Sequence, residues 1–342
     1  MEYKFLTLDD ALIGMSNELL EKAVGRGTRG FQCFEMPEPV LITIEDPTSR
    51  IIKNPARAWS KTLPVAESIW LLNGVNSMDL PGSITKNLYN FSDDGLFMRA
   101  GYGPRIRSFS GVQQDYKVKF PNDRKSFLGK SIGYADQLKY VIESFKKDPN
   151  TRQASITIHD PAKDCFNLDG SLKTTKDTPC TRTIKFEKKN GRLDCTVTMR
   201  SNDVLWGFSA VNVFNFTMMQ EIVSMLTNIP IGRYHHFVDN FHYYESVKDS
   251  IIKIANSEYS NKEEPFYYSG LNGVDFDKFD KLLNSLYHSS IQILGVGGNQ
   301  NPYSSLELQK TGIDIFDDML LQIFKFKNKE LCDNKFNNYK FN

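Results

Sequence analysis

One cysteine of the chain stands in a setting that could support covalent catalysis. Cys180 follows Pro179 in the segment DTPCTRT, and a strand-like run begins directly after it. Because proline fixes φ, we expect the thiol to lie at the start of a strand, where it can face a cleft. A thiolate is a strong nucleophile where cations stabilise it, whereas an isolated cysteine is more often a small buried apolar residue. The neighbouring residues therefore decide between the two interpretations.

A polar cluster follows at the end of a predicted strand, in the consecutive segments MRSND and VLWGFSAVN. Arg200, Ser201 and Asp203 crowd this strand end. Asp203 and Gly207 precede a long apolar helix that we expect to begin near Asn212. Arginine can clamp a phosphate through two parallel hydrogen bonds, and serine adds a hydroxyl group. The alternative is a strand-end salt bridge with a helix cap at Asn212, and the segment alone leaves both interpretations open.

The charge balance excludes some classes of partner. The 342 residues include 42 Lys and Arg and 41 Asp and Glu, which gives a net charge of +1. This balance provides no overall field for a nucleic-acid backbone, although a local pocket for one phosphate remains compatible with it. The apolar stretches are far shorter than the ~20 residues of a membrane span, and the segment MEYKFLTLDD lacks the apolar core of a signal peptide. We expect no direct contact with nucleic acid or membrane.

The cysteines indicate a reducing compartment. Their number is odd, and they show neither CxxC spacing nor the density of a disulfide scaffold. They are Cys33, Cys165, Cys180, Cys195 and Cys332. We therefore predict a cytoplasmic protein without a bound metal, whose chemistry depends on single placed side chains.

The elements that must position these side chains alternate in type. Residues 132–147 carry apolar side chains at helical spacing, and residues 154–159 alternate as a half-buried strand does. Two alternating runs flank Asn190-Gly191 within residues 183–199, which predicts a hairpin. Residues 211–228 are apolar enough for a central helix, and residues 234–244 alternate again. We predict an α+β fold in one large domain, 1–342, with helices packed on one face of a mixed sheet.

Two segments differ in composition from the rest. A polar, turn-rich stretch near 255–275 indicates an irregular segment or insertion, and residues 325–342 are rich in Lys and Asn, as a solvated tail would be.

The ordered set of motifs resembles the thymidylate synthases and the related pyrimidine nucleotide hydroxymethylases. The segments PC, RSND, a glycine, an asparagine that opens a helix and FHYY follow one another as in that family. Upstream, AESIWLLNG resembles the family's Glu-x-x-Trp helix, GYG its Tyr-Gly turn and DPNTRQ its Asp-Pro-x-x-Arg loop, whereas GRGTRGFQCFE is a degraded form of its phosphate loop. The resemblance runs in order from about residue 20 to about residue 250. It implies a homodimer that forms through the sheet.

The resemblance implies roles for three catalytic residues and a folate. Cys180 would add to C6 of a pyrimidine ring and make C5 nucleophilic, and C5 would attack the methylene group of 5,10-methylenetetrahydrofolate. Glu67 would organise proton transfers and water near the base. Its apolar neighbours in the sequence should raise its pKa into a useful range. Tyr102 would assist removal of the C5 proton. Outside such a site, Glu67 would be a surface glutamate and Tyr102 a half-buried turn residue.

The same resemblance assigns residues that hold the nucleotide monophosphate and the folate. Those expected at the phosphate are Arg26, Arg200, Ser201 and, from the second subunit, Arg152. Arg29 competes with Arg26 because the loop is about one residue shorter than the family pattern, and Gln153 stands where the family often has a second arginine. His242 and Tyr244 would hold the sugar 3′-hydroxyl, and Asp203 and Gly207 would lie near the pterin.

One side chain should select the base. An amide can pair with O4 and N3–H of uracil, whereas a carboxylate suits cytosine. Strict alignment places Val211 at the base-reading position, but valine can read neither base. We therefore infer a one-residue insertion and predict that Asn212 reads uracil. The segment RSNDVLWGF is also very like that of the deoxycytidylate hydroxymethylases of phages, which keeps cytosine as an alternative.

Departures from the methylating members favour a hydroxymethyl product. Thr181 replaces the histidine after the cysteine, Met199 replaces a glutamine, and NNYKFN replaces a closing apolar C-terminus. Water that enters the site would attack the exocyclic methylene and outcompete hydride transfer. We predict 5-hydroxymethyl-dUMP. The alternatives are a dCMP or CMP hydroxymethylase, a thymidylate synthase that makes dTMP, and a catalytically inactive nucleotide-binding relative.

Overall fold

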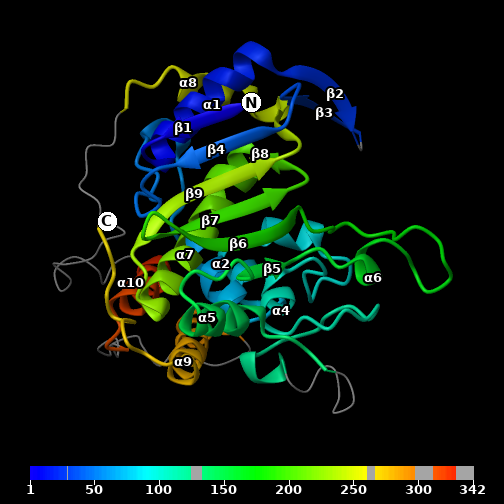
Figure 1. Ribbon diagram of the computed structural model, residues 1–342. Helices are drawn as coiled ribbons and strands as arrows, with labels where there is room; N and C mark the ends of the chain where they lie inside the picture. The colour runs from blue at the N-terminus through cyan, green and yellow to red at the C-terminus, as the bar shows by residue number, and fades with distance from the viewer. Residues whose placement is uncertain (29, 125–132, 260–265, 297–310, 329–342) are drawn as a thin grey trace.

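The computed structural model describes residues 1–28, 30–124, 133–259, 266–296 and 311–328. Within them, the chain folds into two β-sheets and a layer of helices behind the larger sheet (Figure 1). The α+β class predicted from the sequence is confirmed. Only one sheet was expected, because the smaller sheet joins segments that lie far apart along the chain.

The larger sheet has six strands in the order β1-β4-β9-β7-β6-β5. Its strands are β1 (Glu2–Phe5), β4 (Val40–Ile44), β9 (Ile231–Val238), β7 (Arg192–Met199), β6 (Thr181–Lys189) and β5 (Ser155–Thr157). The β1–β4 and β7–β9 pairs are parallel and the other pairs antiparallel, so the sheet is mixed, as predicted. Along β7, Cys195, Val197 and Met199 are fully buried, whereas the residues between them are half-buried. Helices therefore cover one face, and the other face is open (Figure 1).

The predicted hairpin joins β6 and β7. Asn190 and Gly191 form its two-residue loop, with φ of 49° and 79°. Both values lie in the left-handed region, which a type I′ turn requires and which asparagine and glycine tolerate best. The turn sets the register from Lys189–Arg192 to Thr183–Thr198, and an irregularity between Thr183 and Thr181 then shifts it so that Thr181, next to Cys180, pairs with Met199.

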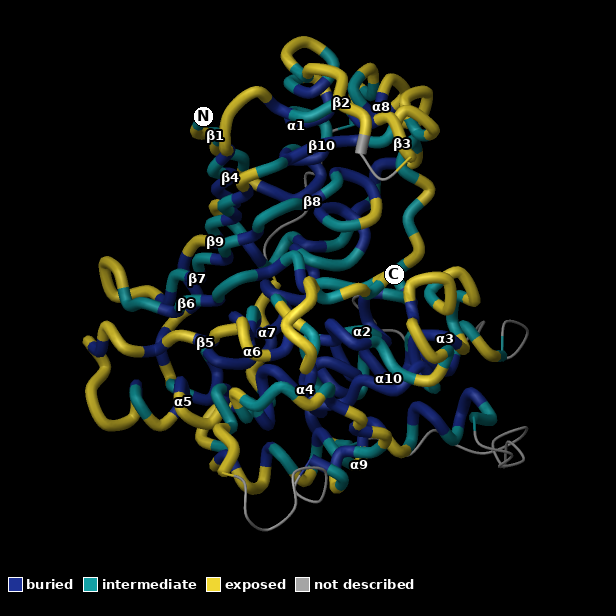
Figure 2. Tube along the Cα trace, turned by 90° about the vertical axis from the view of Figure 1, so that its right-hand side faces the viewer, coloured by how far each residue is buried: buried dark blue, intermediate teal, exposed yellow. Residues whose placement is uncertain are grey.

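The helices that form the core are α2 (Thr62–Leu72) and α7 (Val213–Thr227), and α2 packs against both α7 and α10 (Asp314–Lys327). These segments are dark in the burial view of Figure 2. The predicted helix at residues 132–147 is α5 (Gln137–Lys147). It buries all four of the expected apolar side chains, Leu138, Val141, Ile142 and Phe145. The remaining helices are α1 (Leu8–Lys22), α3 (Asp79–Ile84), α4 (Tyr102–Arg107), α6 (Pro161–Asp164), α8 (Lys248–Ala255) and α9 (Phe276–Leu294).

The central helix begins earlier than predicted. A π-helix spans Val204–Asn212 and continues directly into α7. Gly207 therefore lies within the helical run rather than ahead of it. Asn212 makes no capping hydrogen bond. Instead, the Asp203 carboxylate caps the π-helix by accepting hydrogen bonds from the backbone N–H groups of Leu205, Trp206 and Gly207. The cap expected at Asn212 is thus at Asp203, because a side-chain oxygen there satisfies the first free amides of the helix.

The smaller sheet has four strands in the order β2-β3-β10-β8. They are β2 (Val24–Thr28), β3 (Phe31–Glu35), β10 (Phe241–Tyr244) and β8 (Asn202–Asp203). The sheet brings the N-terminal hairpin, the RSND segment and the FHYY segment together.

The two segments of unusual composition are partly described. Residues 256–259 and 266–275 form no helix or strand. The tail predicted to begin at residue 325 starts within α10, whose last turn runs to Lys327 and whose Phe324 is buried. The first residues of the predicted tail, up to Lys327, therefore form the last turn of a helix. The segment NNYKFN lies outside the described residues.

Within the described ranges, no helix is long and apolar enough to cross a membrane, and no group of three or more His, Cys, Asp and Glu side chains could hold a metal ion.

Candidate active site

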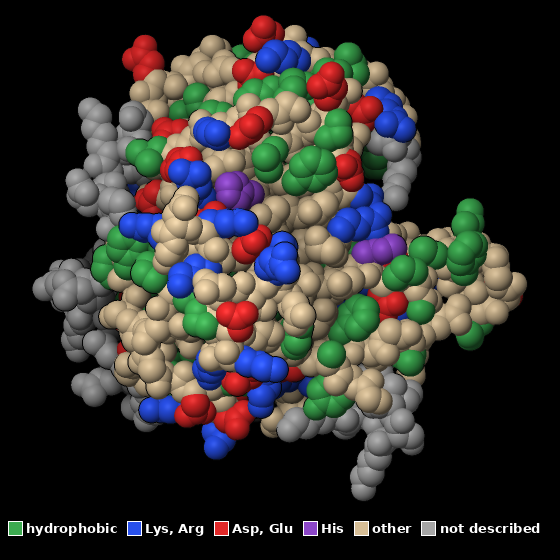
Figure 3. All heavy atoms as spheres, in the orientation of Figure 1, with side chains coloured by type: hydrophobic (Ala, Val, Ile, Leu, Met, Phe, Trp, Pro, Cys, Tyr) green, Lys and Arg blue, Asp and Glu red, His purple; other side chains and the backbone are tan. Residues whose placement is uncertain are grey.

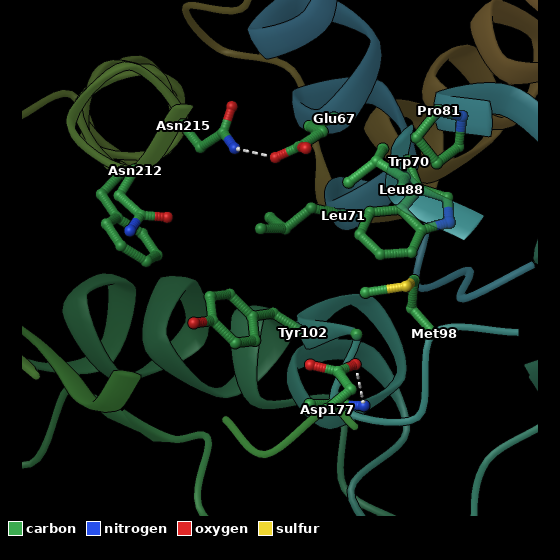
Figure 4. A pocket seen from close by; sticks show the side chains of 13 residues that line it. Glu67, Trp70, Leu71, Pro81, Leu88, Met98, Tyr102, Asp177, Asn212 and Asn215 are labelled. Carbon is green, nitrogen blue, oxygen red and sulfur yellow. Dashed lines mark hydrogen bonds between the residues drawn. The ribbon is translucent and has the colours of Figure 1, made fainter. Parts of the chain in front are cut away.

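A cavity of about 160 Å³ lies where α2, the start of α4, the segment before β6 and the central helix meet. Glu67, Trp70 and Leu71 come from α2, and Asn212, Asn215 and Phe216 come from the central helix. Figure 4 shows these side chains around one space, with Tyr102 and Asp177 on the side opposite Glu67. The remaining lining residues are Pro81, Leu88, Met98, Ala100 and Gly101. The cavity thus combines apolar walls with a few polar groups, as small-molecule sites do.

Glu67 faces the cavity from α2, and an amide on α7 fixes it. Asn215 donates a hydrogen bond from Nδ2 to Oε2 of Glu67 at 3.2 Å. Ser68 donates to Oδ1 of the same amide at 2.8 Å, which orients the NH₂ group toward Glu67. Burial raises the pKa of Glu67 to about 7, and the Asn215 hydrogen bond lowers it in part. The apolar neighbours in the sequence predicted this direction, and a carboxyl group with this pKa can both give and take protons near neutral pH.

Tyr102 connects the cavity to the predicted nucleophile. Its ring stacks on Phe216 with centroids 6.2 Å apart, and its hydroxyl oxygen accepts a hydrogen bond from the Thr181 N–H at 3.2 Å. Burial raises the pKa of Tyr102 far above its usual value, and the nearby Cys180 raises it further. The hydroxyl therefore keeps its proton and can donate a hydrogen bond into the site.

Cys180 lies directly before β6, as the sequence predicted, and it is half-buried. Arg200 donates a hydrogen bond from Nη2 to the Cys180 sulfur at 3.5 Å. The same guanidinium donates to the carbonyl oxygens of Thr178 and Pro179, both at 3.0 Å, so it holds the loop and the thiol together. A guanidinium beside a sulfur stabilises negative charge there. Cys180 is not itself one of the residues that line the cavity, and it adjoins the cavity through the Thr181–Tyr102 hydrogen bond.

The segment in which the sequence indicated an inserted residue, between Gly207 and Asn212, lies in the π-helix. A π-helix forms i→i+5 hydrogen bonds where an α-helix forms i→i+4 bonds, and such turns often occur at functional sites. Asn212, at the end of the π-helix, lines the cavity, whereas Val211 does not. Met199 lies beside the side-chain amide of Asn212, because its sulfur is 3.9 Å from Asn212 Nδ2.

Gly207 has a packing role that the sequence did not indicate. A Cβ atom at this position would lie 2.1 Å from Nδ2 of Asn202. Asn202 is fixed because its Oδ1 lies 3.0 Å from Nε2 of the fully buried His236. Burial lowers the pKa of His236 to about 3, so the ring is neutral and Nε2–H can donate to the amide oxygen.

The small sheet carries three of the residues predicted to bind the sugar and the phosphate, namely Arg26, His242 and Tyr244. His242 pairs in register with Asp203, and Arg26 and Tyr244 both pair with Cys33 from opposite sides. The Arg26 side chain is exposed and forms a salt bridge with Glu35 at 3.0 Å. Ser201 lies between Arg200 and β8 and is half-buried. Arg29 lies outside the described residues.

Arg152 is in a different part of the molecule from this group. It is exposed on the loop between α5 and β5, and Gln153 is exposed beside it. This loop leads into β5, an edge strand of the six-stranded sheet, whereas Arg26 lies on β2 of the four-stranded sheet.

Two polar residues of the cavity were missed by sequence reasoning. Asn215 follows Asn212 by three residues, so the two amides share one helix face, and that spacing was the available signal. Asp177 stands three residues before Cys180 in the same short motif. Its Oδ2 atom accepts a hydrogen bond from the Ala100 N–H at 2.7 Å, and burial raises its pKa to about 6.

The family is decided by comparison with known sequences. Residues 58–278, more than half of the chain, match the family profile described as thymidylate synthase. The chain belongs to the thymidylate synthase family. The resemblance drawn from the sequence motifs is confirmed, and the matched range includes Glu67, Tyr102, Cys180 and Asn212.

Two relatives of the chain share one name, and a third is a thymidylate synthase. The deoxyuridylate hydroxymethyltransferase of Bacillus phage SP01 is 32% identical over 232 residues, which are 66% of this chain and 56% of the relative. The protein of the same name from Pseudomonas phage M6 is 28% identical over 250 residues, 73% of this chain and 62% of the relative. Thymidylate synthase 1 of Bacillus subtilis (strain 168) is 23% identical over 209 residues, 60% of this chain and 65% of that protein. The chain therefore spans 56–62% of the length of these two hydroxymethyltransferases.

Proposed function

We propose that the protein transfers a one-carbon unit from 5,10-methylenetetrahydrofolate to C5 of dUMP and releases 5-hydroxymethyl-dUMP. The observation that carries this proposal is the Cys180–Arg200 pair, which adjoins a cavity that contains Glu67, Tyr102 and Asn212. The names of the phage relatives favour uracil and a hydroxymethyl product.

The residues have separate parts in the chemistry. Cys180 adds to C6 of the pyrimidine, and the Arg200 guanidinium stabilises its thiolate. Asn212 pairs with O4 and N3–H of uracil, and Tyr102 donates a hydrogen bond near C5. Glu67 deprotonates the water that completes the hydroxymethyl group. Cys180 then leaves C6 as the product forms.

The apolar walls of the cavity fit the aromatic part of a folate. Trp70, Leu71, Leu88 and Met98 line it, and Trp206, 61% exposed, lies beside Gly207 on the π-helix. When bound, the folate supplies the methylene group. Asp203 and Gly207 remain the residues that we expect near the pterin, although the Asp203 carboxylate already accepts three backbone hydrogen bonds.

The phosphate and the sugar would be held from the small sheet and its neighbouring strand end. Arg26, Arg200 and Ser201 are the proposed phosphate contacts within one subunit, and His242 and Tyr244 would hold the 3′-hydroxyl. Arg152 would come from a second subunit. The open face of the large sheet, with half-buried Arg182, Thr196 and Phe237, supports a homodimer that forms through this face.

One assay tests the reaction and its alternatives together. The protein is incubated with dUMP, dCMP, UMP or CMP and methylenetetrahydrofolate, and the mass of the nucleotide product is measured by mass spectrometry. We expect dUMP to gain one CH₂O unit with release of tetrahydrofolate. A methylated product with dihydrofolate would identify a thymidylate synthase, and turnover of dCMP or CMP a cytosine hydroxymethylase. Binding without turnover or a Cys180 adduct would identify an inactive relative.

Replacing Asn212 by Asp should change the base preference. A buried amide that pairs with uracil leaves polar groups unmatched against cytosine, and each mismatch costs ~1–3 kcal/mol. Asn212→Asp should therefore lose kcat/KM for dUMP and gain it for dCMP. Val211→Ala is the matched control, because Val211 does not line the cavity and its replacement should leave the preference unchanged. A wild-type preference for dCMP would show that the uracil assignment is wrong.

Replacing Glu67 by Gln should impair the last step more than the first. The glutamine oxygen can still accept the Asn215 hydrogen bond, but it cannot take a proton from water. We expect the covalent adduct with Cys180 to accumulate while product formation falls by ~10²-fold or more. Because Glu67 acts as a base and its pKa is about 7, the wild-type rate should rise with pH through 7.

A thermal measurement on the same variant checks the cause of this pH dependence. The pKa of Glu67 is higher in the folded protein than in the unfolded chain, so ionisation destabilises the fold as pH rises toward 7. Glu67→Gln should consequently raise Tm at pH 8 more than at pH 5. Glu143→Gln, on the exposed side of α5, should change neither the rate nor this Tm difference. Unchanged product formation in Glu67→Gln would exclude Glu67 as the base.

A further inference from the structure

The cavity contains a second carboxyl group, Asp177, which has no part in the mechanism described above. It lines the same wall as Tyr102, across the cavity from Glu67 (Figure 4). The chain places it three residues before Cys180, and its Oδ2 atom bonds to the N–H of Ala100, two residues before Tyr102. Asp177 is therefore close along the chain to Cys180 and is linked through Ala100 to the start of the helix that carries Tyr102. In the proposed function, Cys180 and Tyr102 lie at the reacting edge of the pyrimidine.

The segment that carries Asp177 is held in place by its backbone. The Asp177 N–H donates to Thr175 Oγ1 at 3.1 Å, and its carbonyl oxygen accepts a hydrogen bond from Arg99 at 3.3 Å. Arg99 is itself anchored to Asp164, which binds Arg105 through both carboxylate oxygens at 2.8 and 2.9 Å. Arg105 is fully buried, so this anchor is shielded from solvent. One oxygen of the Asp177 carboxylate is fixed by Ala100, and Figure 4 shows the other turned toward the cavity.

The electrostatic surroundings leave Asp177 able to exchange a proton. Among the residues that the structure describes, no lysine, arginine or histidine forms an ion pair with its carboxylate. Burial is the main cause of its raised pKa of about 6, and the surrounding groups modify this value. The Ala100 N–H and the charges of Arg105 and Arg99 lower it, and Asp93 raises it. Asp177 lies on the same wall of the cavity as Tyr102, and its negative charge contributes to the raised pKa of that residue.

The proposed reaction needs a base on this side of the ring. After C5 has bonded to the methylene group, the C5 proton must be removed before tetrahydrofolate can leave. The proposed function places Tyr102 near C5, but its strongly raised pKa prevents it from accepting the proton as a phenolate. Glu67 lies on the opposite wall and is bonded to Asn215. A carboxylate beside Tyr102 meets the requirement.

We propose that Asp177 is the base that takes the proton from C5, directly or through one water that Tyr102 holds. In this step the C5–H bond breaks and its electron pair forms the double bond from C5 to the exocyclic methylene. The bond between that methylene and the folate nitrogen breaks, and tetrahydrofolate leaves with the electron pair. The proton remains on Asp177 and later passes to solvent. The inference rests on the proposed function, and it holds for a methyl or a hydroxymethyl product, since both outcomes need this step.

The test measures cleavage of the C5–H bond itself. Wild-type protein and Asp177→Asn are incubated with methylenetetrahydrofolate and dUMP that carries tritium at C5, and tritium released to water is counted. Asparagine keeps an oxygen for the Ala100 N–H, so the segment should stay in place. We expect tritium release to fall by ~10²-fold or more, while the covalent adduct between Cys180 and the nucleotide, which also contains the folate, accumulates. Asp169→Asn, in the exposed loop before the segment, is the matched control and should release tritium at the wild-type rate.

The pH dependence of tritium release adds a second readout. A base with a pKa of about 6 is active when ionised, so wild-type tritium release should fall as pH drops through 6. This acid limb should be absent from the residual rate of Asp177→Asn, and it should persist in Glu67→Gln.

Each outcome has a distinct meaning. Tritium release by Asp177→Asn at the wild-type rate would overturn the role of Asp177 and leave the proposed function intact. An absence of the covalent adduct in this variant would also overturn it, because Asp177 would then act before C5–H cleavage. If the wild-type protein released no tritium from dUMP, the proposed function itself would fail.

Discussion

Cys180→Ala should have no measurable turnover and should still bind the nucleotide. The variant lacks the atom that would add to C6, and without this addition C5 does not become nucleophilic. The loss should be at least ~10³-fold, as is usual when a covalent nucleophile is removed. The loop should keep its shape, because Arg200 would still donate hydrogen bonds to the carbonyl oxygens of Thr178 and Pro179. The phosphate contacts proposed for Arg200 and Ser201 would also remain.

Two measurements check this expectation. Equilibrium binding of dUMP should be within a few-fold of the wild-type value, and mass spectrometry of the denatured protein should detect a nucleotide adduct in the wild type only. Cys165→Ala is the matched control, because Cys165 is a half-buried free thiol at the end of α6 and away from the lining residues of the cavity. Turnover that survives in Cys180→Ala would rule out the mechanism proposed for this site.

The parts of the fold that follow from local chemistry could be predicted. The Asn190-Gly191 hairpin depends on two residues that tolerate positive φ, and α5 depends on four apolar side chains at helical spacing. Both signals lie within a few residues of the element that they specify. The thiol at the start of β6 follows equally from Pro179 and the alternating run after it.

The start of the central helix could not be predicted, because two local signals compete there. Gly207 and the polar residues before Val204 resemble a loop, yet Asp203 accepts hydrogen bonds from three consecutive amides, and the helix starts at Val204, eight residues before the predicted start near Asn212. The backbone then forms a π-helix, whose period differs from the one used to read amphipathic patterns. The spacing from Gly207 to Asn212 suggested an inserted residue, but it gave no sign of a π-helix in this segment.

The small sheet and the second acid depend on contacts between distant segments. Arg26 and Tyr244 lie on either side of Cys33 because β3 pairs with the neighbouring β2 on one side and with β10, far along the chain, on the other. Asp177 becomes part of the cavity because Ala100, 77 residues earlier, donates a hydrogen bond to it. Single residues carry no periodic signal of such contacts, so the sequence could nominate Cys180 and Glu67 but could not nominate Asp177.

Arg152 offers the most direct test of a site shared between two subunits. It is exposed on the loop before β5, whereas Arg26, His242 and Tyr244 belong to the small sheet. If Arg152 binds the phosphate of a partner's site, Arg152→Ala should be nearly inactive as a homodimer because one cationic contact to a phosphate dianion is lost. Cys180→Ala is inactive for a different reason, so the two variants damage different halves of each site.

Mixing the two inactive variants should therefore restore activity. In a heterodimer, the subunit with Arg152→Ala keeps Cys180 and receives an intact Arg152 from the Cys180→Ala subunit, so one of the two sites is complete. Random exchange makes half of the dimers mixed, and the expected recovery is about a quarter of the wild-type rate per subunit. A mixture of Cys180→Ala and Cys180→Ser is the matched control, since every site in it lacks the thiol and none can recover. Absence of recovery in the first mixture, measured after subunit exchange is complete, would mean that each subunit builds its phosphate site alone and that Arg152 serves another purpose. Recovery near a quarter would place Arg152 across a dimer interface at the partner's nucleotide, a contact that a single chain cannot make for itself.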